Sequence, residues 1–129
     1  MTHETVHLTI DDAILIHADQ IARYGGDPGL RDPGLLASAL AQPRASFGGH
    51  AAHADLYEQA GAYLFHIVSN HPFIDGNKRV GAVAALVFLE LNGVSIVAPT
   101  GDLYTLVMGV VSGDVRKQEV AQFFRTRAR

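Results

Sequence analysis

The sequence predicts an all-α fold, and three observations lead to this prediction. Apolar residues recur at steps of three and four along most of the chain, which is the spacing of one helix face. No polar side chain occurs between Val80 and Leu89, so a helix there would be apolar on every side and would lie in the middle of the fold. Only Val94 to Val97 looks strand-like, and it is short. We therefore expect about six helices around one buried helix.

Capping residues and helix breakers set the expected boundaries. A Thr or Asp that precedes an apolar period is a good N-cap, and Gly or Pro after it ends the helix. Residues 44–53, RASFGGHAAH, contain glycines and no sustained period, so we expect a loop or a short hairpin there. The expected helices run from Thr9 to Gly25, from Asp32 to Pro43, from Asp55 to Pro72 and from Asn77 to Gly93, with two more around residues 103–111 and 120–124.

Composition indicates one globular domain, residues 1–129. Apolar residues make up 48% of the chain and charged residues 18%, which is unlike a disordered protein. The longest apolar run is too short to cross a bilayer, and the N-terminus lacks the basic start and apolar core of a signal peptide. There is no cysteine, hence neither a disulfide nor a thiolate site. Together these features favour a cytoplasmic protein.

The formal net charge of −3 argues against general binding to nucleic acid. The chain ends in the basic segment RTRAR, residues 125–129. We interpret this segment as a frayed, solvated helix end. A nucleic-acid-binding arm is a distant second interpretation, so no direct contact with nucleic acid is expected.

The turn before the apolar helix is crowded with polar residues. A helix start leaves its first N–H groups without intrahelical partners and carries a partial positive charge. Gly76 permits a close approach to the backbone, and Lys78 and Arg79 add formal positive charge. These cations oppose the helix dipole by about 0.3–1 kcal/mol each when exposed. We infer that an external anion offsets this cost, and phosphate oxygens suit such a site.

Two further groups in this turn would complete a site for phosphoryl transfer. A histidine has an ordinary pKa near neutrality, so His71 could accept a proton from an attacking hydroxyl. Asp75 could hold Mg²⁺ through one carboxylate, with water and phosphate oxygens as the other ligands. Each residue also has a structural interpretation: His71 could simply end a helix before Pro72, and Asp75 could be a turn former. Lys78 and Arg79 could likewise be solvated surface charges.

The segment HPFIDGNKR, residues 71–79, closely resembles the signature of the Fic/Doc family, H-P-F-x-D/E-G-N-G/K-R. The segments LTIDDAILIHADQIARYGG, GLRDPGLLASALAQP, AYLFHIVSNHPF and FLELNG extend the resemblance to the Doc (death-on-curing) toxin branch over most of the chain. The resemblance implies a compact helical domain in which a central helix follows the signature loop.

The resemblance also implies a role for each signature residue. His71 would be the general base, Phe73 would anchor the loop in the core, and Asp75 would take the metal. Arg79 would grip phosphate oxygens. The phosphate-binding turn would consist of Gly76, Asn77 and Lys78.

Two positions depart from the AMP-transferring members of the family. Those enzymes usually have glycine at the position of Lys78 and an arginine at that of Ala82. Doc-type toxins share the lysine and resemble kinases that move the γ-phosphoryl group of ATP onto a hydroxyl of elongation factor Tu. We therefore expect a Mg²⁺-dependent toxin that phosphorylates a protein and arrests translation. The alternatives are AMP transfer to a protein and a non-catalytic protein that keeps the nucleotide pocket.

The resemblance extends to regulation. Many Fic proteins carry an inhibitory helix of the form S/T-x-x-x-E-G/N, and this sequence contains no such string. Inhibition would then come from another chain, as in toxin–antitoxin pairs, in which a small antitoxin inserts a segment across the cleft. We therefore expect a cognate antitoxin as a partner.

Outside the signature the candidates are weaker. The segment GLRD and the RASFGG stretch resemble Doc regions near the cleft. Loop structure and capping explain these residues about as well as target docking does. His50 and His53 are spaced for a metal but lack a third ligand, so a surface loop is the better interpretation. His17 and His66 lie on apolar helix faces and are expected to be satisfied core residues. The target-docking candidates are Arg31, Asp32, Arg44 and Phe47.

Overall fold

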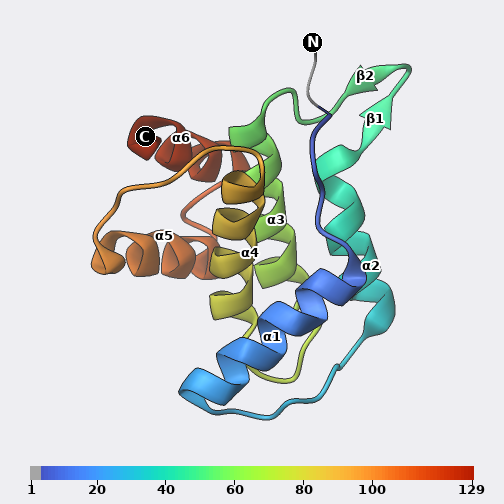
Figure 1. The fold of residues 1–129 in the computed structure, drawn as a ribbon, viewed down its shortest axis with the longest axis vertical. Coiled ribbons are helices and arrows are strands. Elements are labelled where there is room, and N and C mark those ends of the chain that lie inside the picture. Colours follow the sequence, from blue (N-terminus) through green and yellow to red (C-terminus); the bar gives the residue numbers. More distant parts are fainter. Residues whose placement is uncertain (1–3) are drawn as a thin grey trace.

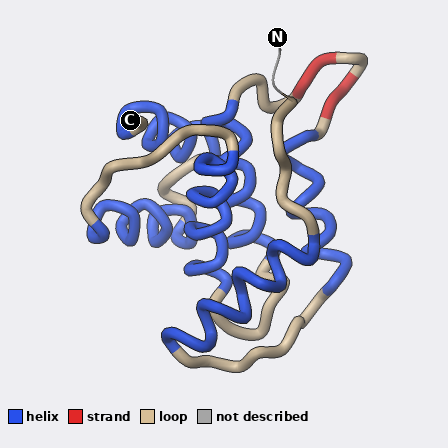
Figure 2. Tube along the Cα trace, in the orientation of Figure 1, coloured by secondary structure: helices blue, strands red, loops and turns tan. Residues whose placement is uncertain are grey.

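The structure is a computed structural model that describes residues 4–129, so the first three residues of the expected domain lie outside the described part. The all-α prediction, with at most a short hairpin, is confirmed (Figures 1 and 2). None of the described helices is long and apolar enough to cross a membrane. In residues 4–129 the elements are α1 (Ile10–Tyr24), α2 (Pro33–Ala41), the short 3₁₀ helix η1 (Gln42–Arg44), β1 (Ser46–Phe47), β2 (His50–Ala51), α3 (Leu56–Asn70), α4 (Asn77–Leu91), α5 (Thr100–Ser112) and α6 (Lys117–Arg127).

Helices α3 and α4 lie side by side in the centre (Figure 1). Helix α4 contacts α1, α3 and α5, while α3 also contacts α2 and α6. Two glycines let these helices approach closely. A Cβ on Gly81 would lie 2.8 Å from Val68 of α3, and a Cβ on Gly61 would lie 3.1 Å from main-chain atoms of α6. Glycine inside a helix costs about 1 kcal/mol, and here close packing offsets that cost.

Side-chain caps fix the first three helices where the sequence predicts them. Thr9 accepts a hydrogen bond from the N–H of Asp12, whose carboxylate accepts from the N–H of Thr9, which completes a capping box. Asp32 caps α2 through the N–H of Leu35 at 2.9 Å. Asp55 caps α3 in the same way. Helix α4 has no such side-chain cap, which matters for the site.

The C-terminal segment is held in place, so the prediction of a frayed end was wrong. Arg125 forms an ion pair with Asp55 at 2.9 Å, which ties α6 to the start of α3. Ala128 forms an isolated antiparallel bridge with Ile96, and the N–H of Arg129 donates to the carbonyl of Ser95 at 2.8 Å. The strand-like segment 94–97 thus receives the end of the chain. These contacts escaped the sequence because they join distant segments.

Candidate active site

A cleft of about 950 Å³ opens where four segments of the chain meet. These segments are the end of α1, the loop 71–76, the first two turns of α4 and one side of α5. The cleft is lined by the proposed base, metal ligand and phosphate-binding residues of the signature: His71, Asp75, Gly76, Asn77, Lys78 and Arg79.

His71 ends α3 and lines this cleft. Its main chain adopts the left-handed conformation, with φ 53° and ψ 52°. It is the only described residue other than glycine with a positive φ. This conformation costs an L-residue roughly 1–2 kcal/mol, so contacts around His71 must offset it. One of them is the capping bond from the N–H of His71 to the carbonyl of Ile67, at 3.2 Å.

The main chain of segment 29–32 forms hydrogen bonds with the main chain of the loop 71–76. The N–H of Ile74 donates to the carbonyl of Gly29 at 3.0 Å. In return, the N–H groups of Arg31 and Asp32 both donate to the carbonyl of Pro72, at 2.8 and 2.9 Å. The guanidinium group of Arg31 donates to the carbonyls of Asn70 and His71. Of the four docking candidates, Arg31 and Asp32 therefore make structural contacts at the loop.

Phe73 is buried at 2% exposure inside the loop. Its ring stacks on the imidazole of His17 from α1, with the ring centroids 3.8 Å apart. Nε2 of His17 lies 2.9 Å from the carbonyl oxygen of Asp75. A carbonyl can only accept, so Nε2 carries the proton and donates. His17 is a satisfied buried residue, as expected, but its partner is the signature loop.

Asn77 closes the loop with its side chain. Its Oδ1 accepts from the N–H of Phe73 and its Nδ2 donates to the carbonyl of Phe73, both at 2.9 Å. The side chain is buried at 3% exposure. The amide group is therefore used in shaping the turn, and Asn77 can offer a phosphate its main-chain N–H.

The turn leaves the start of α4 open to an anion. Gly76 is the N-cap residue, with φ 84°, and no side chain caps the helix. The first N–H groups of a helix have no intrahelical acceptors. Lys78 is exposed, and no ion pair engages its ammonium group within residues 4–129. Arg79 lies 5.1 Å above the ring centroid of Tyr24 and close to the carbonyl of Gly25.

The carboxylate of Asp75 is partly engaged. Its Oδ2 accepts from the N–H of Asp27 at 2.7 Å, which fixes the side chain against the loop after α1. Its Oδ1 makes no hydrogen bond within residues 4–129. The described residues contain no group of three or more His, Asp or Glu side chains that could hold a metal alone. This donor set fits Mg²⁺ bound through one carboxylate, with water and phosphate oxygens as its other ligands.

Comparison with known proteins identifies the family. The sequence model of the Fic/DOC family matches residues 7–89. The chain belongs to the Fic/Doc family. It is 33% identical over 119 residues to "Protein kinase doc" of Escherichia phage P1; the aligned region covers 92% of this chain and 93% of the relative. It is 40% identical over 89 residues to "Toxin Doc" of Mycolicibacterium smegmatis, which covers 69% of this chain and 68% of the relative.

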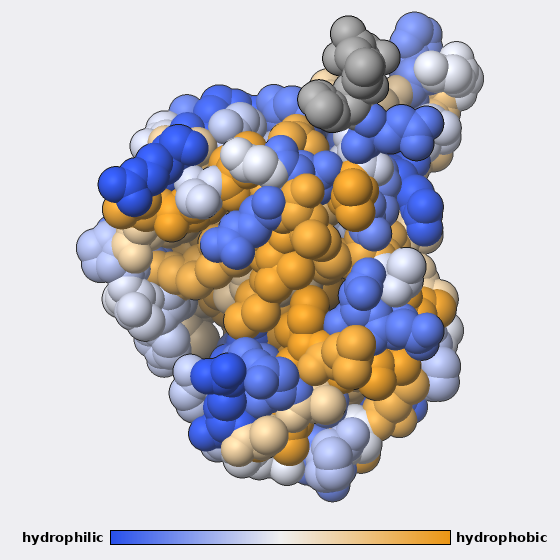
Figure 3. Space-filling view, viewed as in Figure 1, coloured by the Kyte–Doolittle hydropathy of each residue, from blue (hydrophilic) through white to orange (hydrophobic). Residues whose placement is uncertain are grey.

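The Fic/Doc match ends within α4, yet the cleft continues beyond it. Helix α5 supplies the opposite wall, with Leu103, Tyr104, Val107 and Met108. Tyr104 is 66% exposed. The sequence does not predict this wall, because the period of α5 indicates only which side of the helix is apolar, not what that side faces. The space-filling view shows an apolar area over α4 that is bordered by polar side chains (Figure 3).

The other two docking candidates lie apart from the Fic/Doc signature. Phe47 is 74% exposed on the hairpin, and Arg44 is exposed in η1 just before it. The hairpin projects at the end of the molecule opposite to α1 (Figure 1). Neither residue lines the cleft. Target docking through them stays a prediction.

Two histidines outside the signature, His53 and His66, lie near Lys117; His66 is half-buried, although the sequence predicts a core residue. His53 is buried at 7% exposure, so the prediction that it lies in a surface loop was wrong; His50 is exposed. Burial lowers the pKa of His53, and the nearby Lys117 lowers it further. Burial also lowers the pKa of His66 to about 4, helped by Lys117, whose ammonium lies 3.2 Å from Nε2 of His66. The cluster of His53, His66 and Lys117 contains no residue of the signature.

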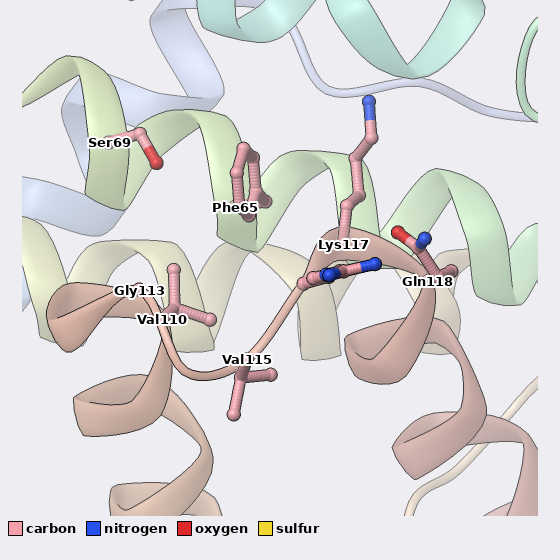
Figure 4. A pocket seen from close by; sticks show the side chains of 8 residues that line it. Phe65, Ser69, Val110, Gly113, Val115, Lys117 and Gln118 are labelled. Atoms are coloured by element: carbon pink, nitrogen blue, oxygen red, sulfur yellow. The ribbon is translucent and has the colours of Figure 1, made fainter.

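A second cavity, of about 380 Å³, lies between α3 and the turn from α5 to α6 (Figure 4). Phe65 and Ser69 of α3 face Val110 and Val115 across it. Arg116, Lys117 and Gln118 begin α6 at its edge. None of the signature residues lines this cavity, so the larger cleft is the candidate active site.

Proposed function

We propose that this protein is the toxin of a type II toxin–antitoxin system and transfers the γ-phosphoryl group of ATP to a hydroxyl of a protein. Elongation factor Tu is the proposed target, and its modification would arrest translation in the cytoplasm. One observation carries the proposal: His71 lines the same cleft as the uncapped, cationic start of α4. A base beside an anion site is what phosphoryl transfer requires.

Each side chain has a defined task in this reaction. The N–H groups at the start of α4, with Lys78 and Arg79, would hold phosphate oxygens. His71 would take the proton of the target hydroxyl while the hydroxyl oxygen forms a bond to the γ-phosphorus. The bond from this phosphorus to the bridging oxygen would break, and ADP would leave with that electron pair. Asp75 would hold Mg²⁺, which neutralises phosphate charge when bound.

Two positions favour phosphoryl transfer over AMP transfer. Lys78 places an ammonium group at the start of α4, where the AMP-transferring pattern has glycine, and Ala82 lines the cleft where that pattern has arginine. Without that arginine, the cleft has one cation fewer to hold a triphosphate in position for attack at its α-phosphorus. The name of the phage P1 relative, a protein kinase, also supports this choice.

A cognate antitoxin is the proposed inhibitor. The cleft combines an exposed cationic turn with an apolar wall on α5, and the apolar area over α4 lies on the face drawn in Figure 3. A segment of the antitoxin laid across the cleft would cover both. The name "Toxin Doc" of the M. smegmatis relative supports this proposal. Expression without the antitoxin is then expected to stop growth, and His71→Ala is expected to restore it.

Intact-mass measurement of the target tests the reaction. The purified protein is incubated with Mg²⁺, ATP and elongation factor Tu. We expect the factor to gain the mass of one phosphoryl group, and His71→Ala to abolish this gain. A gain the size of AMP would overturn the choice of reaction. No gain on this factor, nor on any protein of a whole-cell lysate treated with γ-labelled ATP, would refute the kinase proposal.

A further inference from the structure

We propose that Arg31 is a positioning residue that holds His71 in its left-handed conformation. This inference deepens the proposed function, because it concerns how the base of that reaction is held. The sequence indicates Arg31 only as a candidate for docking the target. The structure gives its guanidinium group a different set of partners.

The side chain of Arg31 caps the end of α3. Its Nε donates to the carbonyl of His71 at 2.7 Å, and one terminal nitrogen donates to the carbonyl of Asn70 at 3.0 Å. These are two of the last carbonyls of the helix, which have no intrahelical donors. A cation at this end also interacts favourably with the helix dipole. One planar group thus binds the main chain of the base and of the residue before it.

His71 needs such support because its neighbours in the chain do not favour its conformation. Pro72 disfavours a right-handed helical conformation in the preceding residue and favours an extended one. His71 adopts neither, since its φ is 53° and its ψ is 52°. In this geometry of the main chain, the carbonyl of His71 accepts from the guanidinium group at 2.7 Å. The bond from Arg31 therefore stabilises the left-handed conformation of His71.

Arg31 is itself held firmly. Its N–H and that of Asp32 both donate to the carbonyl of Pro72, at 2.8 and 2.9 Å. Leu30 and Phe73 form an antiparallel bridge, and Asp32 caps α2. The base is therefore anchored through Arg31 to α2, not only to its own helix. With its donors on main-chain carbonyls, the guanidinium group is less free to bind a target protein.

Loss of Arg31 leaves the phosphate-binding turn in place. Asn77 closes that turn through Phe73, and His17 holds the carbonyl of Asp75. What changes is the direction in which His71 presents its imidazole. A displacement of about 1 Å at a reacting group lowers the rate by roughly 100-fold. Substitution of Arg31 should therefore affect turnover and leave the binding of ATP and of the target unchanged.

The test compares Arg31→Gln, Arg31→Lys and Arg116→Gln in steady-state transfer to elongation factor Tu. Arg116 is exposed at the start of α6 and serves as the charge-matched control. We expect Arg31→Gln to lower kcat by roughly 10- to 100-fold with the KM values for ATP and target unchanged. Arg31→Lys keeps the charge but loses the planar fork of donors, so its kcat should fall to an intermediate value. Arg116→Gln should match the unsubstituted protein.

A raised KM for the target with normal kcat would overturn the inference in favour of docking. Full activity of Arg31→Lys would overturn it as well, because the planar pair of donors would then have no role. A structural readout separates this inference from the proposed function. The imidazole Cε1–H resonance of His71, assigned by its loss in His71→Ala, is followed by NMR without nucleotide. It should shift or split in Arg31→Gln and stay as it is in Arg116→Gln. An unchanged resonance in Arg31→Gln refutes the positioning role even if the protein transfers no phosphoryl group.

Discussion

The imidazole of His17 lies parallel to the ring of Phe73, with centroids 3.8 Å apart and planes 6° from parallel. The same imidazole donates to the carbonyl of Asp75 at 2.9 Å. A Cβ on Gly76 would lie 3.7 Å from its Cδ2. One buried side chain of α1 therefore contacts Phe73 and Asp75 of the signature loop, and it leaves little room for a side chain at Gly76. We infer that α1 supports this loop from the inside and fixes the backbone that carries Asp75.

Replacing His17 by phenylalanine tests this support. The ring and its stack on Phe73 are kept, but the hydrogen bond to the carbonyl of Asp75 is lost. The loss of one hydrogen bond costs about 0.5–1.5 kcal/mol, so the free energy of unfolding should fall by that amount in urea titrations. Phosphoryl transfer should fall as well, because the backbone of Asp75 is no longer fixed.

His50→Phe is the matched control for this substitution. His50 is exposed on the hairpin and lies outside the cleft. Its replacement should change the free energy of unfolding by less than about 0.5 kcal/mol. If His17→Phe behaves like His50→Phe in both stability and transfer, the contact with Asp75 has no supporting role.

Replacing His71 by glycine should stabilise the fold and abolish transfer. Glycine adopts a positive φ without the steric cost that a Cβ imposes, and the φ of His71 is 53°. The expected gain in the free energy of unfolding is roughly 1 kcal/mol. His71→Ala, which keeps a Cβ, should be equally inactive without this gain. If the glycine variant unfolds at lower urea than the alanine variant, the left-handed conformation carries no strain.

Replacing Lys78 by glutamine should weaken ATP binding without loss of stability. The ammonium group lies at the positive end of α4, where it opposes the helix dipole by about 0.3–1 kcal/mol. Its removal should therefore raise the free energy of unfolding slightly. Isothermal titration with Mg²⁺ and ATP should show weaker binding. Arg116→Gln removes a cation at the start of α6, outside the cleft, and should leave ATP binding unchanged. Equal ATP affinities of both variants would contradict a phosphate-binding role for Lys78.

Local signals in the sequence were enough to predict the helices. The capping box of Thr9 and Asp12 and the N-cap Asp32 join residues that are close in the sequence, so the sequence alone indicates them. Long-range contacts were not predictable in this way. The bridge of Ile96 to Ala128 joins segments that carry no mutual signal. The C-terminal segment was therefore expected to fray, although contacts within the fold hold it.

The candidate site shows the same division. The sequence predicts that His71, Asp75 and Lys78 belong to one site, because they lie close together along the chain. The supports of this turn come from elsewhere: His17 from α1 and Arg31 from the segment before α2. In the sequence, His17 resembles any histidine on an apolar helix face. Its partner became evident only when the fold brought α1 against residues 73–76.

The pKa of His66 gives the fold a predictable acid sensitivity. The ordinary histidine pKa is 6.5, and burial lowers that of His66 to about 4. Lys117 and His53 contribute to this lowered pKa as well, after burial. At a pH between 6.5 and 4 the unfolded chain binds the proton and the folded one does not. The free energy of unfolding should therefore fall as the pH drops through this window, and it should level off below pH 4 as far as His66 determines it.

His66→Gln isolates this contribution, because glutamine does not titrate. Urea titrations at pH 7 and pH 5 should show a smaller loss of stability for this variant than for the unsubstituted protein. Part of the loss should remain, since burial also lowers the pKa of His53. His50→Gln, in the exposed hairpin, should lose as much stability as the unsubstituted protein. An equal loss in His66→Gln, or an NMR titration midpoint of His66 near 6.5, would show that His66 is not desolvated between α3 and α6.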